Sequence, residues 1–189
     1  MKLRWYRLLG QLLAPRFQLI MARRLHPEAG RSLDVGCGGW SCLSAVGMAP
    51  YGVDISFERT RAFGSGVVAS AIALPFADGS FDSVWSFGLL HHLPDHDARE
   101  AIREMRRVTR PGGRTVVFDG VLPRRAWQRP LAWAIRRLDH GRWMRRQEAL
   151  DASLESAGAW SRERFTYSYV GLEGVFATCE LTSDPRNGR

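Results

Sequence analysis

The sequence has almost no lysine, few cysteines and no long hydrophobic run. Lys2 is its only lysine, so arginine carries nearly all of a formal net charge of +8 over 189 residues. The three cysteines lack the spacing of a zinc site and are interpreted as free thiols, which is typical of a reducing compartment. No apolar run approaches the ~20 residues needed to span a bilayer, and the basic N-terminus lacks the uninterrupted apolar core of a secretion signal. These absences argue against a secreted or membrane-spanning protein and predict a cytoplasmic location.

The length allows one α/β domain with a full core and is too short for two. We expect this domain over residues 31–181, preceded by a basic amphipathic helical segment over 1–30 and followed by a flexible tail over 182–189. Arginines concentrate before Arg31 and between Arg124 and Arg146, outside the predicted nucleotide-binding half. Compositional bias explains part of this charge, but its clustering favours an anionic partner.

A glycine-rich turn is the strongest local signal. A short apolar run ends in Asp34-Val35-Gly36-Cys37-Gly38, and a second run ends twenty positions after Asp34 in Asp54. In an open α/β sheet such glycines let backbone N–H groups approach a ligand, and a carboxylate after the second strand accepts hydrogen bonds from ribose hydroxyls. The spacing therefore predicts a nucleoside site.

The hydrophobic pattern predicts alternating strands and helices, as in a doubly wound parallel sheet. A turn over 171–174 joins the last two apolar runs and predicts a C-terminal β-hairpin. The expected strands are 32–35, 52–54, 67–69, 83–87, 115–119, 162–170 and 175–181, and the expected helices are 3–25, 41–46, 57–63, 98–108 and 147–157.

Three further motifs follow the glycine turn in a fixed order. They are Leu74-Pro75-Phe76, then Leu90-His91-His92-Leu93-Pro94, then Arg110-Pro111-Gly112-Gly113. With this order, residues 31–121 closely resemble the class I S-adenosylmethionine-dependent methyltransferases, specifically the type 11, ubiquinone-biosynthesis-like group. The resemblance implies a Rossmann-like α/β fold with a seven-stranded sheet, mostly parallel with an antiparallel C-terminal hairpin, and helices on both faces. It also implies S-adenosyl-L-methionine as the cofactor.

The resemblance assigns the glycine turn to the cofactor. Gly36, Cys37 and Gly38 would approach its methionyl part and ribose through their backbone. Asp34 would anchor the turn or the amino group, and Asp54 would accept hydrogen bonds from the ribose hydroxyls. An aspartate that only caps a helix or a turn is the competing interpretation of Asp54.

The same resemblance places further residues around the adenine and the sulfonium. Ile55 would lie against the adenine, with Ala71 and Ile72 on its other side. Ser86 and Phe87, at the end of the fourth strand, would lie under the sulfonium.

Two positions depart from the pattern of the family. Trp40 stands where a third glycine is usual, so its side chain must point away from the ligand or narrow the methionyl pocket. Ser70 stands where an aspartate often accepts a hydrogen bond from the adenine amino group, and a hydroxyl is a weaker partner. These departures leave open a catalytically degenerate methyltransferase-like subunit that binds a partner.

His91 and His92 are the first candidates for a general base, because imidazole titrates near neutrality and their loop faces the sulfonium in the family. Asp119, at the end of the fifth strand, is the other candidate. Histidines that merely pack against the cofactor are the competing interpretation. The loop also carries Asp95, His96 and Asp97, but adjacent residues rarely chelate one ion together, so no metal is expected.

The segment 122–146, rich in arginine and tryptophan, occupies the place where the family inserts substrate-recognition elements. Its arginines could bind phosphates and its tryptophans could stack on sugar rings or bases. The competing interpretation is a surface helix with solvated arginines and buried tryptophans. For the helix over 3–25, packing on the sheet edge competes with lying on a membrane surface.

The sequence thus predicts methyl transfer, with a hydroxyl of a small-molecule, lipid-linked or glycan acceptor as the leading target. An anionic acceptor at the inner face of the membrane would suit the basic segments, with membrane contact through the N-terminal helix. An RNA acceptor is the alternative that also fits the charge and the tryptophans. Against it, Ser86-Phe87-Gly88-Leu89 stands where a base-methylating enzyme would carry an asparagine-proline-proline type of motif.

Overall fold

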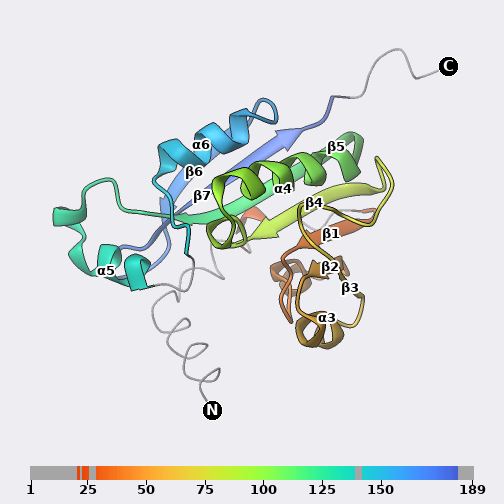
Figure 1. Ribbon diagram of the computed structural model, residues 1–189, viewed down its shortest axis with the longest axis horizontal. Helices are drawn as coiled ribbons and strands as arrows, with labels where there is room; N and C mark the ends of the chain where they lie inside the picture. Colours follow the sequence, from red (N-terminus) through yellow and green to blue (C-terminus); the bar gives the residue numbers. More distant parts are fainter. Residues whose placement is uncertain (1–20, 22, 26–28, 139–141, 183–189) are drawn as a thin grey trace.

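The computed structural model describes residues 21, 23–25, 29–138 and 142–182. These residues form one seven-stranded sheet with the order β3-β2-β1-β4-β5-β7-β6 (Figure 1). The first five strands are parallel, whereas β7 pairs antiparallel with both β5 and β6. The predicted fold class is therefore confirmed, including the antiparallel hairpin at the edge of the sheet.

Strand bounds follow the predictions closely in the first half of the chain. The strands are β1 (Ser32–Val35), β2 (Tyr51–Asp54), β3 (Gly66–Val68), β4 (Phe81–Phe87), β5 (Thr109–Val121), β6 (Ser161–Thr166) and β7 (Glu173–Glu180). The prediction for β6 began one residue late and ended four residues late. Its chain turns after Thr166, where the Tyr167 N–H donates to the Leu172 carbonyl at 3.0 Å.

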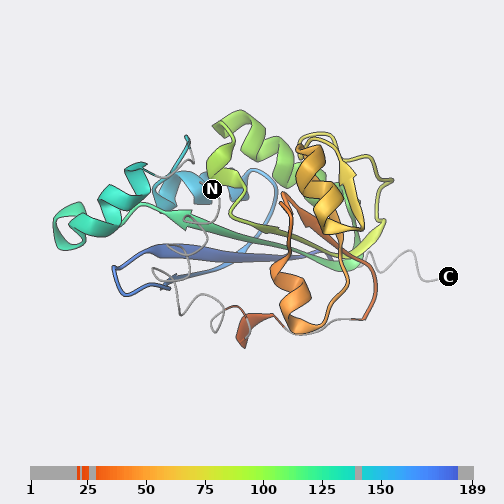
Figure 2. The ribbon, with the colours of Figure 1, turned by 90° about the horizontal axis from the view of Figure 1, so that it is seen from below.

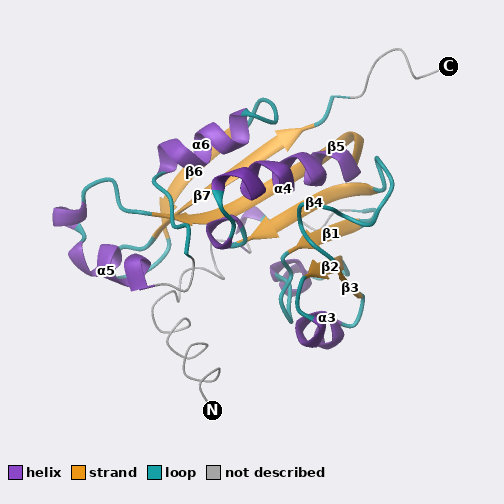
Figure 3. Ribbon diagram, viewed as in Figure 1, coloured by secondary structure: helices purple, strands orange, loops and turns teal. Residues whose placement is uncertain are grey.

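Helices cover both faces of the sheet (Figures 2 and 3). One face carries α4 (Asp95–Val108) and α6 (Gln147–Glu155), whose buried residues share one core with the inner strands. The other face carries the 3-10 helix η1 (Cys42–Val46) and part of α5 (Pro130–Leu138), with Trp85 and Phe118 between them. The short helices α3 (Phe57–Phe63), η2 (Leu90–His92) and η3 (Ala126–Gln128) lie in connections.

The predicted N-terminal helix lies mostly outside the described residues. Met21 and Leu25 fall within them, and both side chains are buried in the core cluster that contains Trp85. This contact agrees with packing on the sheet for the end of the segment. The predicted tail lies outside the described residues beyond Thr182. In the described part of the chain, no helix combines the length and apolarity that crossing a membrane requires.

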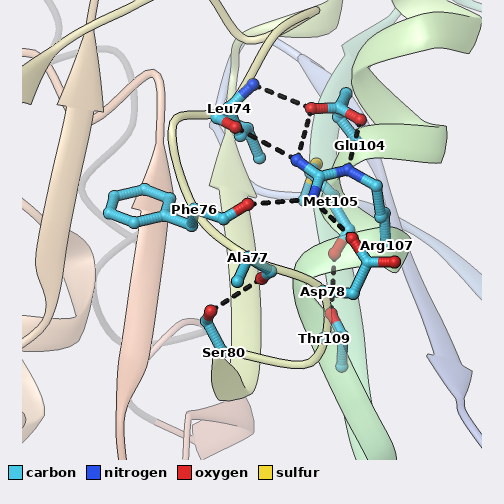
Figure 4. A network of polar contacts seen from close by, with 9 residues as sticks. All are labelled: Leu74, Phe76, Ala77, Asp78, Ser80, Glu104, Met105, Arg107 and Thr109. Atoms are coloured by element: carbon cyan, nitrogen blue, oxygen red, sulfur yellow. Dashed lines mark hydrogen bonds and ion pairs between the residues drawn. The ribbon is translucent and has the colours of Figure 1, made fainter.

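The connection from β3 to β4 is irregular but is attached to α4 through Arg107 (Figure 4). The Arg107 guanidinium donates to the carbonyls of Leu74 and Phe76 at 3.0 and 2.8 Å and to Asp78 at 2.7 Å. Glu104 completes the network by accepting from Arg107 and from the Leu74 N–H, which lies 2.8 Å away. Hydrogen bonds from Arg107 lower the pKa of the Glu104 carboxyl, so the pair stays charged.

Candidate functional site

The glycine turn lies at the carboxyl end of β1, where the strand order reverses between β1 and β4. Open α/β sheets bind ligands at such a point. The Gly36 and Cys37 N–H groups both donate to the Val53 carbonyl, at 2.7 and 3.0 Å. Gly36 has a φ of +77°, and a Cβ there would lie 2.9 Å from the Leu89 side chain. Both observations explain why glycine is required at this position.

Asp54 is buried at the end of β2, and backbone donors hold its carboxylate on both sides. One oxygen accepts from the Gly38 N–H at 3.0 Å, and the other accepts from the Ser56 N–H at 2.9 Å. The Arg59 guanidinium lies 4.0 Å away. Each carboxylate oxygen can accept more than one hydrogen bond, so the group is fixed in place with capacity left for two hydroxyls.

Asp34 is buried within β1, and its Oδ1 has no hydrogen-bond partner among the residues that the structure describes. Burial raises the pKa of this carboxyl to about 7, and a hydrogen bond with the Ser41 side chain opposes the rise. Burial together with Asp34 and Asp54 also raises the pKa of the Cys37 thiol to about 12, so this thiol stays neutral. A buried carboxylate oxygen without a partner is costly, and a cationic ligand group would satisfy it.

A cavity of about 310 Å³ opens beside the glycine turn. It brings together six predicted site residues, namely Gly36, Asp54, Ile55, Ser70, Ala71 and His92. It also has five lining residues that sequence reasoning missed, namely Val53, Arg59, Ala69, Leu89 and Leu93. Leu93 belongs to the motif Leu90-His91-His92-Leu93-Pro94 and Leu89 directly precedes it, so their place in the sequence was an available signal. Arg59 lies in the first turn of α3, and no feature of the sequence marked it as a lining residue.

The remaining predicted cofactor residues do not line this cavity. Phe87 lies on the other face of the sheet, where its ring stacks on Trp85 with centroids 6.0 Å apart. Ser86 is buried, and its hydroxyl has no hydrogen-bond partner. Ile72 is partly exposed at the rim of the irregular connection. The Trp40 side chain is 52% exposed and does not line the cavity.

A larger cavity, of about 500 Å³, lies elsewhere, where β5 begins and β7 ends. Its lining includes Arg107, Thr109 and Leu181, and none of the predicted site residues. We therefore place the candidate site in the smaller cavity, where the predicted residues converge.

His91 and Asp119 form one hydrogen-bonded pair. The His91 Nδ1 lies 2.5 Å from one Asp119 oxygen, and the His91 backbone N–H donates to the other at 2.9 Å. The Gly120 N–H also donates to Asp119, at 2.7 Å. Because a carboxylate only accepts, the imidazole donates through Nδ1, so Nε2 is the nitrogen through which the neutral ring could accept a proton. The structure thus joins two residues that the sequence presented as separate candidates.

The neighbouring histidine has a different environment. The rings of His91 and His92 lie with centroids 4.2 Å apart, but only His92 lines the cavity. The side chain of His96 pairs instead with Asp97 on the surface, at 3.2 Å. Within the described ranges, no three histidine, cysteine or acidic residues are grouped so that they could hold a metal ion.

In segment 122–146, the burial of several tryptophan and arginine side chains is the opposite of that expected for a plain surface helix. Its tryptophans are exposed, with Trp127 at 75% and Trp133 at 39%, whereas Arg136 and Arg145 are buried. Arg136 donates to the Tyr167 hydroxyl and to the Glu173 carbonyl, so its charge is solvated by protein groups. The interpretation as solvated arginines over buried tryptophans was wrong for these residues, because tertiary acceptors compensate the buried guanidinium groups.

Comparisons with known proteins agree on the class of domain. A family model described as a methyltransferase domain matches residues 33–117. Methyltransferase GfsG of Streptomyces halstedii is 35% identical over 116 residues, which cover 52% of this chain and 41% of that protein. The 27-O-demethylrifamycin SV methyltransferase of Amycolatopsis mediterranei is 37% identical over 119 residues, which cover 54% of this chain and 43% of that protein. The chain thus spans less than half the length of these two curated relatives.

A solved structure covers more of the chain. A SAM-dependent methyltransferase from Thermotoga maritima, described as a possible histamine N-methyltransferase, superposes with a TM-score of 0.70 at 19% identity. The match covers 95% of this chain and 94% of that one. At this identity the likeness shows the fold alone.

Proposed function

We propose that residues 33–117, which match a family model described as a methyltransferase domain, form a class I S-adenosylmethionine-dependent methyltransferase domain, and that the chain methylates a hydroxyl of a small-molecule, lipid-linked or glycan acceptor. The observation that carries the proposal is the Asp54 carboxylate, held by two backbone N–H groups at the edge of a cavity beside the glycine turn. This arrangement suits the two hydroxyls of a ribose.

The residues of the cavity, together with Asp34 of the neighbouring strand β1, fit the cofactor that the family uses. Asp54 would accept from the ribose hydroxyls, and the partnerless Asp34 Oδ1 would accept from the ammonium group of the methionyl part. Ile55, Ser70 and Ala71 would enclose the adenine. S-adenosylmethionine supplies a methyl group already activated on a sulfonium, so the protein's task is to orient the acceptor and remove its proton.

His91 is the proposed general base. Asp119 fixes the Nδ1–H tautomer, and Nε2 can then accept the hydroxyl proton while the acceptor oxygen forms its bond to the methyl carbon. The carbon–sulfur bond breaks with its electron pair on sulfur, so the products are the methyl ether and S-adenosylhomocysteine. Asp119 acts through His91, because three N–H groups already occupy its carboxylate. The name of the rifamycin relative, which specifies an oxygen, supports an oxygen acceptor.

Calorimetric titration with S-adenosylhomocysteine tests the cofactor site. We expect micromolar binding by the wild-type chain and a loss of about 100-fold or more in Asp54→Ala, because two hydrogen bonds to a charged acceptor are each worth about 1.5–3 kcal/mol. Asp54→Asn is the matched control, since it keeps the shape and one acceptor oxygen and should lose less. Absence of binding to folded wild-type protein would contradict the proposal and favour a non-catalytic subunit.

Ser70 offers a gain-of-function prediction. Ser70→Asp places an ionised acceptor where the adenine amino group is expected, and the affinity for S-adenosylhomocysteine should rise about tenfold. The same titration on Ser70→Ala provides the reference, since removing the hydroxyl should change the affinity little. An aspartate that leaves the affinity unchanged would mean that the adenine does not lie against Ser70.

The exposed face of segment 122–146 supports an anionic, membrane-proximal acceptor on the cytoplasmic side. The exposed indoles of Trp127 and Trp133 stand among arginines, and the Arg137 guanidinium lies 5.3 Å from the centre of the Trp133 ring. α5 lies beyond the carboxyl end of β5 (Figure 1), at the side of the sheet where the acceptor must enter. Basic and aromatic side chains of this kind bind anionic lipid surfaces. The proposed membrane contact of the N-terminal helix falls outside the described residues.

Cosedimentation with vesicles tests this surface. The chain should pellet with vesicles containing phosphatidylglycerol and stay in solution with pure phosphatidylcholine, and salt should reverse the binding. The double variant Trp127→Ala, Trp133→Ala should pellet several-fold less, whereas Phe57→Ala, an exposed apolar residue outside the segment, should behave as wild type. Equal pelleting by all variants, or binding to an RNA oligomer alone, would remove this support for a lipid-linked acceptor.

A further inference from the structure

Arg145 is a buried arginine that does not line the candidate cavity but contacts the loop beside it. Its guanidinium donates to the carbonyls of Leu90 and Leu93, both at 2.6 Å, and to the Asp95 carboxylate at 2.7 Å. The side chain is only 8% exposed, so these bonds are largely shielded from water. One rigid group thus binds the loop between β4 and α4 at two carbonyls and the first residue of α4 at its carboxylate.

The two carbonyls that accept from Arg145 lie on either side of the histidines in the sequence. Leu90 precedes His91, and Leu93 follows His92, so the guanidinium fixes the backbone on either side of both imidazoles. The planar guanidinium presents several N–H groups in a fixed geometry, which a lysine cannot reproduce.

The backbone around Arg145 makes two further connections. The Trp143 N–H donates to the His91 carbonyl at 3.0 Å, and the Leu122 N–H at the end of β5 donates to the Arg145 carbonyl at 2.8 Å. The end of segment 122–146 is therefore bound both to the histidine loop and to the strand that carries Asp119.

We infer that Arg145 is a positioning residue, which holds His91 against Asp119 and keeps His92 and Leu93 in the wall of the cofactor cavity. The inference rests on the proposed function for its meaning, since it assumes that His91 serves as the base. The inference gives segment 122–146 a role beyond contact with the acceptor. Through Arg145 this segment sets the geometry of the base and of the cofactor cavity together.

Substitutions at two neighbouring positions, Arg145 and Arg146, test this inference. Arg145→Ala removes all three side-chain hydrogen bonds. Arg145→Lys keeps the positive charge but can form only some of these hydrogen bonds. Arg146→Ala is the matched control, because Arg146 is the next residue and its side chain is exposed. Circular dichroism checks that each variant is folded.

Two readouts separate positioning from general stability. The first is the nitrogen-15 spectrum of the His91 imidazole, which reports whether Nδ1 carries the proton. In the wild type the Nδ1–H tautomer should dominate, Arg145→Ala should give a mixture of both tautomers, and Arg146→Ala should match the wild type. The second is affinity for S-adenosylhomocysteine, which should fall about tenfold in Arg145→Ala and less in Arg145→Lys.

A folded Arg145→Ala variant with an unchanged His91 spectrum and unchanged affinity would overturn the inference. If that variant does not fold, Arg145→Lys decides by the same two readouts, and wild-type values in both would equally overturn it. Failure of the wild-type chain to bind S-adenosylhomocysteine would instead overturn the proposed function. The His91 spectrum would still test Arg145 in that case, so the two failures are distinguishable.

Discussion

Asp34→Asn is expected to stabilise the ligand-free protein above pH 7. The folded protein keeps the proton on Asp34 up to about pH 7, whereas the unfolded chain releases it near 3.8, so the free energy of unfolding falls as the pH rises between these values. Above pH 7 the ionisation of Asp34 lowers the free energy of unfolding by an amount on the order of 4 kcal/mol. Asparagine never ionises, so the variant does not lose this stability. Urea denaturation at pH 5 and pH 8 measures the effect, which should be large at pH 8 and small at pH 5.

The same substitution should weaken the proposed cofactor site. Without the charge that would pair with the ammonium group, affinity for S-adenosylhomocysteine should fall roughly 100-fold. Wild-type affinity should rise between pH 6 and pH 8 as Asp34 ionises, and the affinity of Asp34→Asn should not. Calorimetry at the two pH values measures both. A variant that is less stable at pH 8, or that binds as tightly as wild type, would show that Asp34 is a structural anchor of the turn.

Substituting the two adjacent histidines should separate catalysis from cofactor binding. His91 is hydrogen-bonded to Asp119 and does not line the cavity, whereas His92 lines it. His91→Asn should therefore lose about 10²–10⁴-fold in the rate of methyl transfer, the usual contribution of a general base, with little change in affinity for S-adenosylhomocysteine. His92→Asn should mainly weaken that affinity.

Transfer of a radiolabelled methyl group to a panel of hydroxyl acceptors provides the rate, and calorimetry provides the affinity. Asp119→Asn should follow His91→Asn in losing rate, because an amide would no longer favour the Nδ1–H tautomer. Full activity in His91→Asn together with loss of activity in His92→Asn would move the role of the base to the neighbouring residue.

Local patterns predicted the strands that carry the nucleotide half of the candidate site. The glycine turn directly follows β1 and Asp54 is the last residue of β2, and the observed β1 and β2 begin within one residue of their predictions. The contact between Gly38 and Asp54 joins two such strand ends, whose proximity follows from the parallel pairing of neighbours. Here the sequence order and the fold class together determine the geometry.

The pairing of His91 with Asp119 could not be predicted in the same way. Both residues were singled out, but they lie 28 positions apart, His91 in the connection after β4 and Asp119 in β5, and only the tertiary structure decides which side chains face each other. The burial of Arg136 and Arg145 is a similar case. From residue type alone, arginine is expected to be exposed and tryptophan to be more buried. This expectation fails where carbonyl groups and a hydroxyl accept hydrogen bonds from a buried guanidinium.

The network around Arg107 has a consequence for the dynamics of the cavity wall. The connection from β3 to β4 begins with Ser70 and Ala71, which line the cavity, and continues into the stretch that Arg107 and Glu104 attach to α4. The Leu74 amide, although it belongs to no helix or strand, donates to Glu104 and should exchange its hydrogen with heavy water slowly. The wall beside the proposed adenine site should therefore open only together with α4, as one cooperative unit.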